Sequence, residues 1–417
     1  MTMPASLAGA AFLADPRVQA LLAMLNREGE QARVIGGAVR NALLGLPIAD
    51  VDICTTATPD TVITRASAAR YKTVPTGIGH GTVTVVIDGV PIEVTTLRED
   101  IETDGRRAKV RFGRDFEADA RRRDFTINAL GVDQSGAVFD YCGGLDDIAA
   151  RRVRFIGEAD QRIAEDYLRI LRFFRFHAAY GQGRLDRTGL EACIAGRAGL
   201  AFLSRERIRA ELLKLLAARG GPQAAKAMSD ASLLNLLLGG APYAARLARA
   251  AEIEATRDQD ADTVLRLAAL AMVTREDAAR LADRLRLSNA ETVRLEAMAQ
   301  ALPAFSPAAA PPPYGRLREL LFQHGRQGAQ DSLLLAHAAS GAAPDDRAWT
   351  SAWRFLRDTP EPRLPFGGAD VVARGVPGGK AVGDVLKRLQ ADWIRAGFPH
   401  EPAVLAHLLD TAMNGPR

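Results

Sequence analysis

The sequence has few cysteines, no long apolar run and no P-loop. Its three cysteines, Cys54, Cys142 and Cys193, lack the spacing of a metal site and cannot all pair with one another. Such cysteine usage is typical of a reducing compartment, so we expect a cytoplasmic protein. No apolar stretch reaches the roughly 18 residues of a membrane helix, and Asp15 and Arg17 interrupt an Ala/Leu-rich start without a basic leader. We therefore expect neither a membrane partner nor a signal peptide.

The 417 residues are 47% hydrophobic and 25% charged, which is typical of a globular protein with two to four domains. Up to about residue 150, strand and helix signals alternate; beyond it, Ala, Leu and Arg dominate with helical periodicity. A proline-rich stretch at 303–313 predicts a break between helical parts. A helix is predicted at Val39–Leu46, and a hairpin turn at Asp88-Gly89. The predicted strands are Arg33–Ile35, Val51–Cys54, Tyr71–Thr76, His80–Ile87 and Pro91–Leu97.

The segments Gly36-Gly37 and Asp50-Val51-Asp52 carry the first functional signal. On a strand, Asp50 and Asp52 would emerge on one face and repel each other unless a cation lies between them. Carboxylate oxygens suit Mg²⁺, which usually also binds substrate phosphates. Two glycines let the backbone approach a phosphate closely. Taken alone, the glycines are an ordinary turn and the aspartates a solvated edge, but strand, Gly-Gly, helix and acidic strand together are typical of nucleotidyl transfer.

Two further segments add polar side chains. Glu93 lies in the middle of an apolar strand, where an unpaired charge is costly, and is the candidate third carboxylate. The alternative is that Glu93 lies on the solvent-exposed face of an edge strand. Arg123 is suited to bidentate binding of triphosphate oxygens. Asp124 and Asn128 would share a face if the segment is a helix and could bind a ribose hydroxyl; the alternative is an Asp helix cap with a basic flank.

Asp166 and Arg169 form the most discriminating pair. Three residues apart on a helix, they would present an acceptor beside a donor. Cytosine and adenine offer an amino donor beside a ring-nitrogen acceptor, whereas uracil and guanine offer a carbonyl and an N–H. The pair therefore predicts acceptance of C and A and rejection of U and G, because a mismatch leaves buried polar groups unpaired. The alternative is a simple helical salt bridge.

Basic residues crowd into one short segment. This clustering favours a polyanionic partner, although a solvated basic loop is an equal alternative. The residues are Arg106, Arg107, Lys109, Arg111, Arg114, Arg121, Arg122 and Arg123.

Together these blocks resemble the class II tRNA nucleotidyltransferases, a family of CCA-adding enzymes and bacterial poly(A) polymerases. Order and spacing agree over some 140 residues, and the likeness continues through Ser204–Glu211 into the family's neck and through 375–393 into its tail. The blocks that carry the resemblance are Gly36–Arg40, Leu43–Gly45, Asp50–Asp52, His80–Val83, Glu93–Thr96, Arg122–Ala129 and Glu165–Arg169.

The resemblance implies an α+β nucleotidyltransferase head at 1–150 with a small mixed sheet, followed by an all-α neck (151–220), body (221–310) and tail (311–417). It implies template-independent addition of C, C and A to the 3′ end of tRNA, using CTP and ATP and releasing pyrophosphate. Asp50 and Asp52 would bind two Mg²⁺ ions, and Glu93 would be the third active-site carboxylate. The nucleotide-binding residues would be Gly36, Gly37, Arg40, Arg123, Asp124, Asn128, Asp166, Arg169 and Arg172.

The same resemblance implies that neck, body and tail hold the acceptor arm of tRNA by its phosphates, and that the loop at Asp104-Gly105-Arg106 belongs to the switch from C to A addition. One departure is Asn41, which stands where the family usually has an acidic residue. Residues 76–80 lack the Gly-Arg-Arg-Phe run of proteobacterial poly(A) polymerases, which favours CCA addition. A poly(A) polymerase, a partial CC- or A-adding enzyme and, more remotely, a non-catalytic RNA-binding protein stay open. The oligomeric state is not predicted.

Overall fold

The computed structural model describes residues 6–103, 108–305 and 309–414, so the predicted switch loop at Asp104-Gly105-Arg106 lies outside the described residues. The chain forms two compact units, Met1–Leu237 and Leu238–Arg417. The α+β part and the first helices belong to the first unit. The finer division into head, neck, body and tail stays a prediction.

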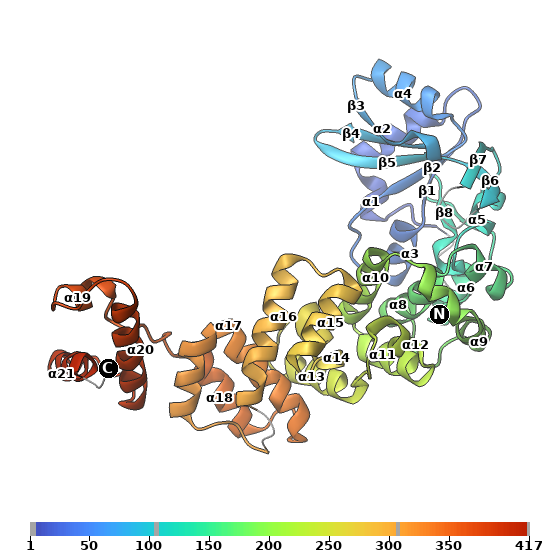
Figure 1. Ribbon diagram of the computed structural model, residues 1–417. Helices are drawn as coiled ribbons and strands as arrows, with labels where there is room; N and C mark the ends of the chain where they lie inside the picture. Colours follow the sequence, from blue (N-terminus) through green and yellow to red (C-terminus); the bar gives the residue numbers. More distant parts are fainter. Residues whose placement is uncertain (1–5, 104–107, 306–308, 415–417) are drawn as a thin grey trace. The chain divides into compact units, whose positions relative to one another are not determined.

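A seven-stranded mixed sheet forms the centre of the α+β part (Figure 1). Its strand order is β3-β4-β5-β2-β1-β8-β9, in which β2 and β5 run parallel and the other neighbours antiparallel. A separate ribbon pairs β6 with β7. The fold class predicted from sequence is thereby confirmed. The strands are β1 (Ala32–Ile35), β2 (Asp52–Thr55), β3 (Lys72–Gly77), β4 (Thr82–Ile87), β5 (Val90–Thr96), β6 (Arg98–Thr103), β7 (Ala108–Phe112), β8 (Leu130–Val132) and β9 (Val138–Asp140).

Each predicted strand is confirmed, and both of its ends agree with the structure to within two residues. The turn between β4 and β5 is the expected hairpin, because Asp88 and Gly89 both have positive φ, at 50° and 79°. Residues Ile78–His80 form a 3-10 turn, so β4 begins later than predicted. The strand β2 also begins later, at Asp52, so Asp50 precedes it.

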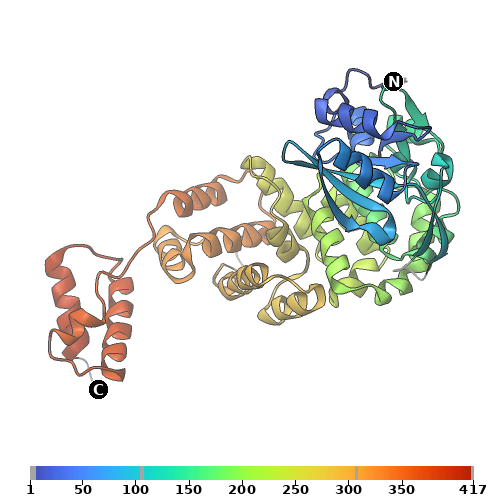
Figure 2. The same cartoon turned by 90° about the horizontal axis from the view of Figure 1, so that it is seen from above.

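Helices pack on the sheet in the first unit, with α2 and α4 in contact with each other and with strands (Figures 1 and 2). The helix α3 contacts β1 and β8, and confirms the helix predicted after the glycine pair. The helices of the α+β part are α1 (Ala11–Ala14), α2 (Pro16–Leu25), α3 (Gly37–Leu44), α4 (Pro59–Ala68), α5 (Phe116–Arg121) and α6 (Gly144–Ala149).

An aromatic core joins the α+β part to the helices that follow it. Phe125, fully buried, has its ring centroid 4.9 Å from that of Phe155 and 5.1 Å from that of Phe176. Phe155 in turn stacks on Phe173, at 5.4 Å. Since Phe173 and Phe176 lie on α8, this core fixes the loop around Phe125 against that helix. The remaining helices of the first unit are α7 (Ala159–Glu165), α8 (Leu168–Tyr180), α9 (Arg187–Ala195), α10 (Arg205–Ala217), α11 (Gly221–Asp230) and α12 (Leu233–Leu238). The last residue of α12, Leu238, is counted with the second unit.

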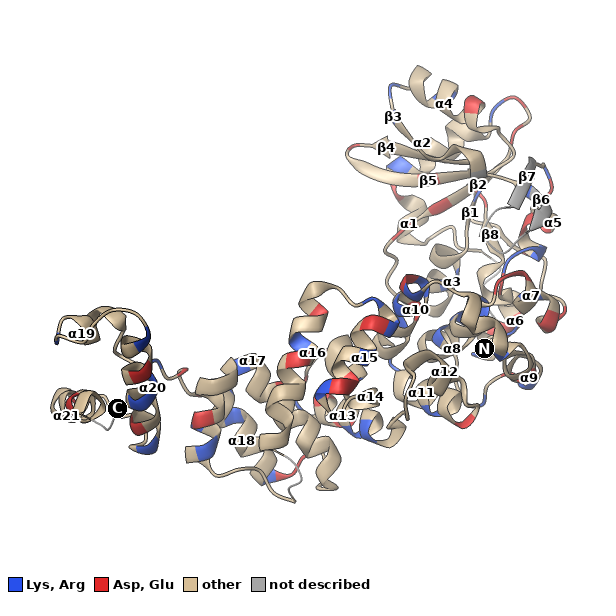
Figure 3. Ribbon diagram, viewed as in Figure 1, with Lys and Arg blue, Asp and Glu red and all other residues tan. Residues whose placement is uncertain are grey.

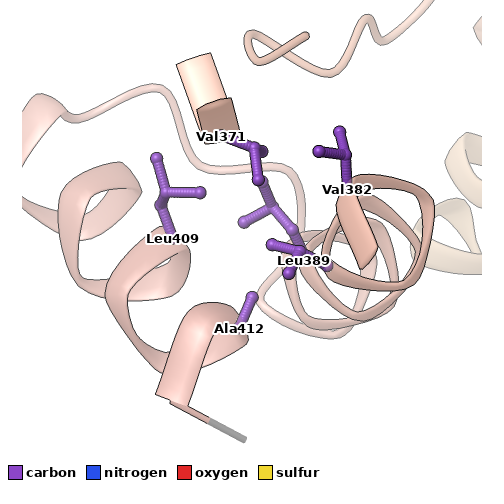
Figure 4. Packing of buried hydrophobic residues seen from close by; sticks show 6 residues of the cluster. Val371, Val382, Leu389, Leu409 and Ala412 are labelled. Atoms are coloured by element: carbon purple, nitrogen blue, oxygen red, sulfur yellow. The ribbon is translucent and has the colours of Figure 1, made fainter. Parts of the chain in front are cut away.

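In the second unit, every regular element among the described residues is a helix, as predicted for this part of the chain. The proline-rich stretch lies between α16 and α17, and α17 bends at Gly325, whose φ is 67°. The last three helices share a core of Val371, Val382, Val385, Leu389, Leu409 and Ala412 (Figure 4). The helices are α13 (Ala244–Thr256), α14 (Thr263–Ala271), α15 (Arg275–Leu285), α16 (Asn289–Ala301), α17 (Tyr314–Ser340), α18 (Arg347–Asp358), α19 (Gly368–Val372), α20 (Lys380–Arg395) and α21 (Pro402–Asn414).

Candidate active site

A cavity of about 400 Å³ in the first unit gathers ten of the twelve predicted site residues; Asp50 and Glu93 are not part of its lining. Two of its residues, Arg122 and Phe176, were not predicted as site residues. The lining consists of Gly36, Gly37, Arg40, Asp52, Arg122, Arg123, Asp124, Asn128, Asp166, Arg169, Arg172 and Phe176. Five of these twelve are arginines, so the cavity is suited to a strongly anionic ligand.

The glycine pair lies where β1 passes into α3. Gly36 has φ 68° and ψ −121°, a conformation that side-chain-bearing residues rarely adopt. A Cβ at this position would lie 3.5 Å from Nη1 of Arg123. The turn therefore brings the first N–H groups of α3 to the cavity, and such groups bind phosphate oxygens well.

Two of the three predicted carboxylates, Asp52 and Glu93, lie side by side at the amino end of β2, where it pairs in parallel with β5. Asp52 is in register with Glu93 on β5. Although Asp52 reaches solvent, desolvation raises its pKa above the usual 3.8, and the charges of Glu93 and Asp50 raise it further. Asp50 lies before the strand, so the prediction that both aspartates belong to one strand was wrong. Asp50 is two residues before Asp52 along the chain.

Carboxylate oxygens of this kind fit a divalent cation, because their like charges repel in its absence. No three His, Cys, Asp or Glu side chains in the described part of the chain are arranged as a complete metal site. An ion at Asp50 and Asp52 would therefore need further oxygen ligands, which is how Mg²⁺ is usually bound beside substrate phosphates.

Arg123 is oriented by a carboxylate that was not predicted. Asp119 on α5 is 3% exposed and accepts hydrogen bonds from Nη2 of Arg123 (3.0 Å) and Nε of Arg122 (2.8 Å). Burial by itself would raise the pKa of Asp119, but the two arginines outweigh it and lower that pKa. The signal in the sequence was an acid three and four residues before two arginines, the spacing of one helix face.

Arg40 is buried without a carboxylate among its hydrogen-bond partners. It is 7% exposed and donates to Oδ1 of Asn128 (2.5 Å), to Oδ1 of Asn41 (2.9 Å) and to the hydroxyl of Tyr180 (2.8 Å). Burial lowers the pKa of this guanidinium. Asn41, which replaces the acidic residue usual in the resembling family, thus orients Arg40 without neutralising it. A buried cation at the cavity wall favours an anionic ligand.

Asp124 and Asn128 meet, but not on an α-helix as predicted. Asp124 precedes a 3-10 turn, Thr126–Asn128. Its Oδ1 accepts from Nδ2 of Asn128 (3.0 Å) and its Oδ2 from Nε of Arg172 (2.7 Å). Burial alone would raise the pKa of Asp124; Arg172 and Asn128 hold it below its usual value.

Asp166 and Arg169 both line the cavity, but the prediction that they share one helix was wrong. Asp166 has an extended backbone (φ −157°, ψ 105°) between α7 and α8, and Arg169 lies in the first turn of α8. Both residues are described, and there is no ion pair between them. Arg207 binds the carboxylate of Asp166 at 2.7 Å, and Glu165 binds Arg169 at 2.5 Å. Arg207 was not predicted as a site residue; it lies in the Ser204–Glu211 block.

No helix of the described residues is long and apolar enough to cross a membrane.

Residues 32–154 match the family model described as the poly A polymerase head domain. This chain is also 31% identical over 391 residues to mouse (Mus musculus) mitochondrial CCA tRNA nucleotidyltransferase 1, over 92% of this chain and 87% of the relative. With the CCA-adding enzyme of Geobacillus thermodenitrificans (strain NG80-2), identity is 43% over 233 residues, 55% of this chain and 56% of the relative.

Among solved structures, the crystal structure of the Bacillus stearothermophilus CCA-adding enzyme in complex with CTP matches with a TM-score of 0.71 and 29% identity. The match covers 94% of this chain and 96% of that one. Several other CCA-adding enzyme structures, below 20% identity, share the fold. With a relative above 30% identity matched over most of both chains, and with the nucleotidyltransferase cavity in place, the chain belongs to the CCA tRNA nucleotidyltransferase family.

Proposed function

We propose that this protein adds C, C and A to the 3′ end of tRNA, taking CTP and ATP as substrates, releasing pyrophosphate and using no nucleic-acid template. The observation that carries the proposal is a single cavity in which Asp52, a set of arginines and the Asp166–Arg169 pair meet. These groups supply, in that order, the reaction centre, the triphosphate site and the site that reads the base. The names of the relatives support the same activity.

The arginines and the glycine turn bind the triphosphate in this proposal. Arg40 brings a buried positive charge with only neutral acceptors, and Arg123 a fork oriented by Asp119. Arg172 adds a third cation, with Asp124 on one side of its guanidinium. The same Asp124 serves the ribose together with Asn128, because both residues line the cavity beside Arg172. Gly36 and Gly37 leave room for the phosphates.

Members of this family generally use divalent metal ions, and we propose Mg²⁺ with Asp50 and Asp52 as its protein ligands. When bound, the ions would activate the 3′ hydroxyl of tRNA and neutralise charge on the phosphoryl oxygens. Glu93 lies in register with Asp52 and keeps a third carboxylate beside the two ligands.

Asp166 and Arg169 read the base. The free acceptor sites of Asp166 receive the amino N–H of cytosine or adenine, and Arg169 donates to the neighbouring ring nitrogen. Uracil and guanine place a carbonyl against the carboxylate and an N–H against the guanidinium, so both contacts are lost together. Discrimination by unpaired buried polar groups is large, roughly 10⁴-fold or more in favourable sites.

The described cysteines are all free, which supports a cytoplasmic location. The relatives from mouse and human are named as mitochondrial, so the cytoplasmic location is proposed from the cysteines alone. The neck, body and tail are proposed to hold the acceptor arm of tRNA.

The test is an addition assay with purified protein, MgCl₂, CTP, ATP and a tRNA transcript that ends before CCA. We expect three nucleotides to be added, in the order C, C, A, and no addition in EDTA. Asp52→Ala should lower the rate by at least about 10³-fold, because the reaction centre loses a metal ligand. Addition that stops after CC, or unlimited A addition, would favour the partial enzyme or the poly(A) polymerase. Full activity of Asp52→Ala would contradict the metal assignment.

A further inference from the structure

Each of the two base-reading residues is bound by a partner outside the pair. Oδ2 of Asp166 accepts a hydrogen bond from Nη2 of Arg207, at 2.7 Å. Its Oδ1 accepts one from the backbone N–H of Leu168, at 3.1 Å. Arg169 donates to Oε2 of Glu165, at 2.5 Å, and to the backbone carbonyl of Arg162, at 2.8 Å. The carboxylate of Asp166 and the guanidinium of Arg169 therefore bind different neighbours and not each other.

This separation is needed for base reading. An acid and an arginine three residues apart at the start of a helix ordinarily attract each other. A mutual ion pair would occupy the acceptor and the donor that the base requires. Arg207 binds one carboxylate oxygen of Asp166, and the backbone N–H of Leu168 binds the other. The carboxylate is therefore held in place at both of its oxygens. A carboxylate has about four acceptor sites, and those left over stay available for an amino group.

Arg207 reaches Asp166 from a different helix. It lies near the start of α10, and α10 packs against α8, the helix that carries Arg169 (Figure 1). The side chain of Arg207 is 33% exposed and is not part of the cavity lining, whereas Asp166 is. Both helices carry arginines, and of the two only α10 carries acidic residues (Figure 3).

We propose that Arg207 is a specificity-determining positioning residue: it keeps Asp166 from pairing with Arg169 and presents the carboxylate to the amino group of cytosine or adenine. The inference rests on the proposed function, since it concerns the same base-reading site. Arg207 does not contact the base. Its effect on selectivity is exerted through Asp166.

The primary test measures kcat/KM for single-nucleotide addition of CTP and of UTP to a tRNA transcript that ends before CCA. In Arg207→Ala, the preference for CTP over UTP should fall by roughly 10- to 100-fold, the value of one or two hydrogen bonds to a charged group. The dissociation constant for the tRNA should stay within about threefold of the original. A weaker tRNA complex with an unchanged CTP/UTP ratio would assign Arg207 to phosphate binding and overturn the proposal.

Two further variants separate positioning from general damage. Arg187→Ala removes the arginine of a more exposed i,i+4 ion pair on α9, Arg187–Glu191 at 2.8 Å, and should leave the CTP/UTP ratio unchanged. Arg207→Lys keeps a charged donor on α10 and should recover part of the preference, even if Arg207→Ala folds poorly. A lysine variant with no recovery at all, despite wild-type thermal unfolding, would contradict an action through hydrogen bonding to Asp166.

A double-mutant cycle tests the route through Asp166. In an Asp166→Ala background, Arg207→Ala should change the CTP/UTP ratio by less than about twofold, because the group that it positions is already absent. Independent, additive effects of the two substitutions would overturn the proposal. If the unmodified protein adds C and A while Arg207→Ala keeps full selectivity, only this inference fails. If the unmodified protein adds neither nucleotide, the proposed function itself fails.

Discussion

At the scale of single residues, the arginines of the cavity differ in what pairs with them. Arg123 and Arg172 each bind a buried acid, Asp119 and Asp124, whereas Arg40 binds only an amide, a second amide and a phenol. Paired arginines are held in one orientation, while an unpaired buried one keeps its full charge for a ligand. These three arginines therefore combine two guanidinium groups oriented by acids with one that has only neutral hydrogen-bond partners.

Asp119→Ala should raise KM for CTP and for ATP by a similar factor, roughly tenfold, and leave the CTP/UTP ratio unchanged. The reason is that Arg122 and Arg123 lose the acceptor that orients them, and the triphosphate is common to all substrates. Steady-state kinetics with each nucleotide would measure this. Glu117→Ala, which breaks the exposed pair with Arg121 on the same helix, is the control and should leave KM unchanged. A KM change confined to one nucleotide would contradict this role for Asp119.

At the scale of elements, the junction of β1 and α3 is the most constrained piece of backbone in the site. Gly36 has a positive φ beside Arg123, while the next residue, Gly37, begins a regular helix. The two adjacent glycines thus have different reasons to be there. Gly36 is required by backbone conformation, and Gly37 by the space that it leaves at the cavity.

Gly36→Ala should lower the free energy of unfolding by about 1–3 kcal/mol, because alanine is strained in this conformation. Gly37→Ala is the matched variant one residue on; its Cβ would lie 3.7 Å from Nη2 of Arg40, an ordinary contact, so stability should change little. Thermal or urea unfolding of both variants would measure the difference. Equal losses at the two positions would show that the positive φ of Gly36 is not the cause.

At the scale of the whole molecule, the proposed chemistry lies in the first unit, while the second unit has ionic networks of its own. Arg294 on α16 binds Asp331 on α17 at 2.8 Å and Asp262 at 2.6 Å. Asp331 is 4% exposed, and burial raises its pKa even though Arg294 and Gln327 oppose the shift. This network joins α16 to α17 and to Asp262, the N-cap residue of α14.

Arg294→Ala should destabilise the second unit by about 3 kcal/mol, because the carboxylate of Asp331 is left buried without its cation. The CTP/UTP ratio should not change, since the base-reading residues lie in the first unit. Calorimetric unfolding and the single-nucleotide assay would check the two statements. Arg316→Ala, which breaks a more exposed pair with Glu319 on α17, should have a much smaller effect. A changed ratio in Arg294→Ala would contradict the assignment of selectivity to the first unit alone.

The sequence alone was sufficient to predict five of the nine described strands, β1 to β5, and the turn at Asp88-Gly89, but not β6, β7, β8 and β9. These features depend on local preferences and on periodicity, which neighbouring residues carry. It also predicted ten residues of one cavity, because their types match the chemistry of a triphosphate and a base edge. The segments at Asp124–Asn128 and Asp166–Arg169 were wrongly assigned to helices, since an i, i+3 or i+4 spacing does not by itself require helical backbone.

Only the tertiary structure decided which charges pair. Asp166 attracts an arginine 41 residues away on another helix and not the arginine three residues along. Arg172 reaches back 48 residues to Asp124. Such choices depend on how α8 and α10 pack and on the aromatic core beneath them, and a linear sequence does not encode them locally. The sequence determined what groups the site contains; the packing of helices determined which of them stay free to meet a nucleotide.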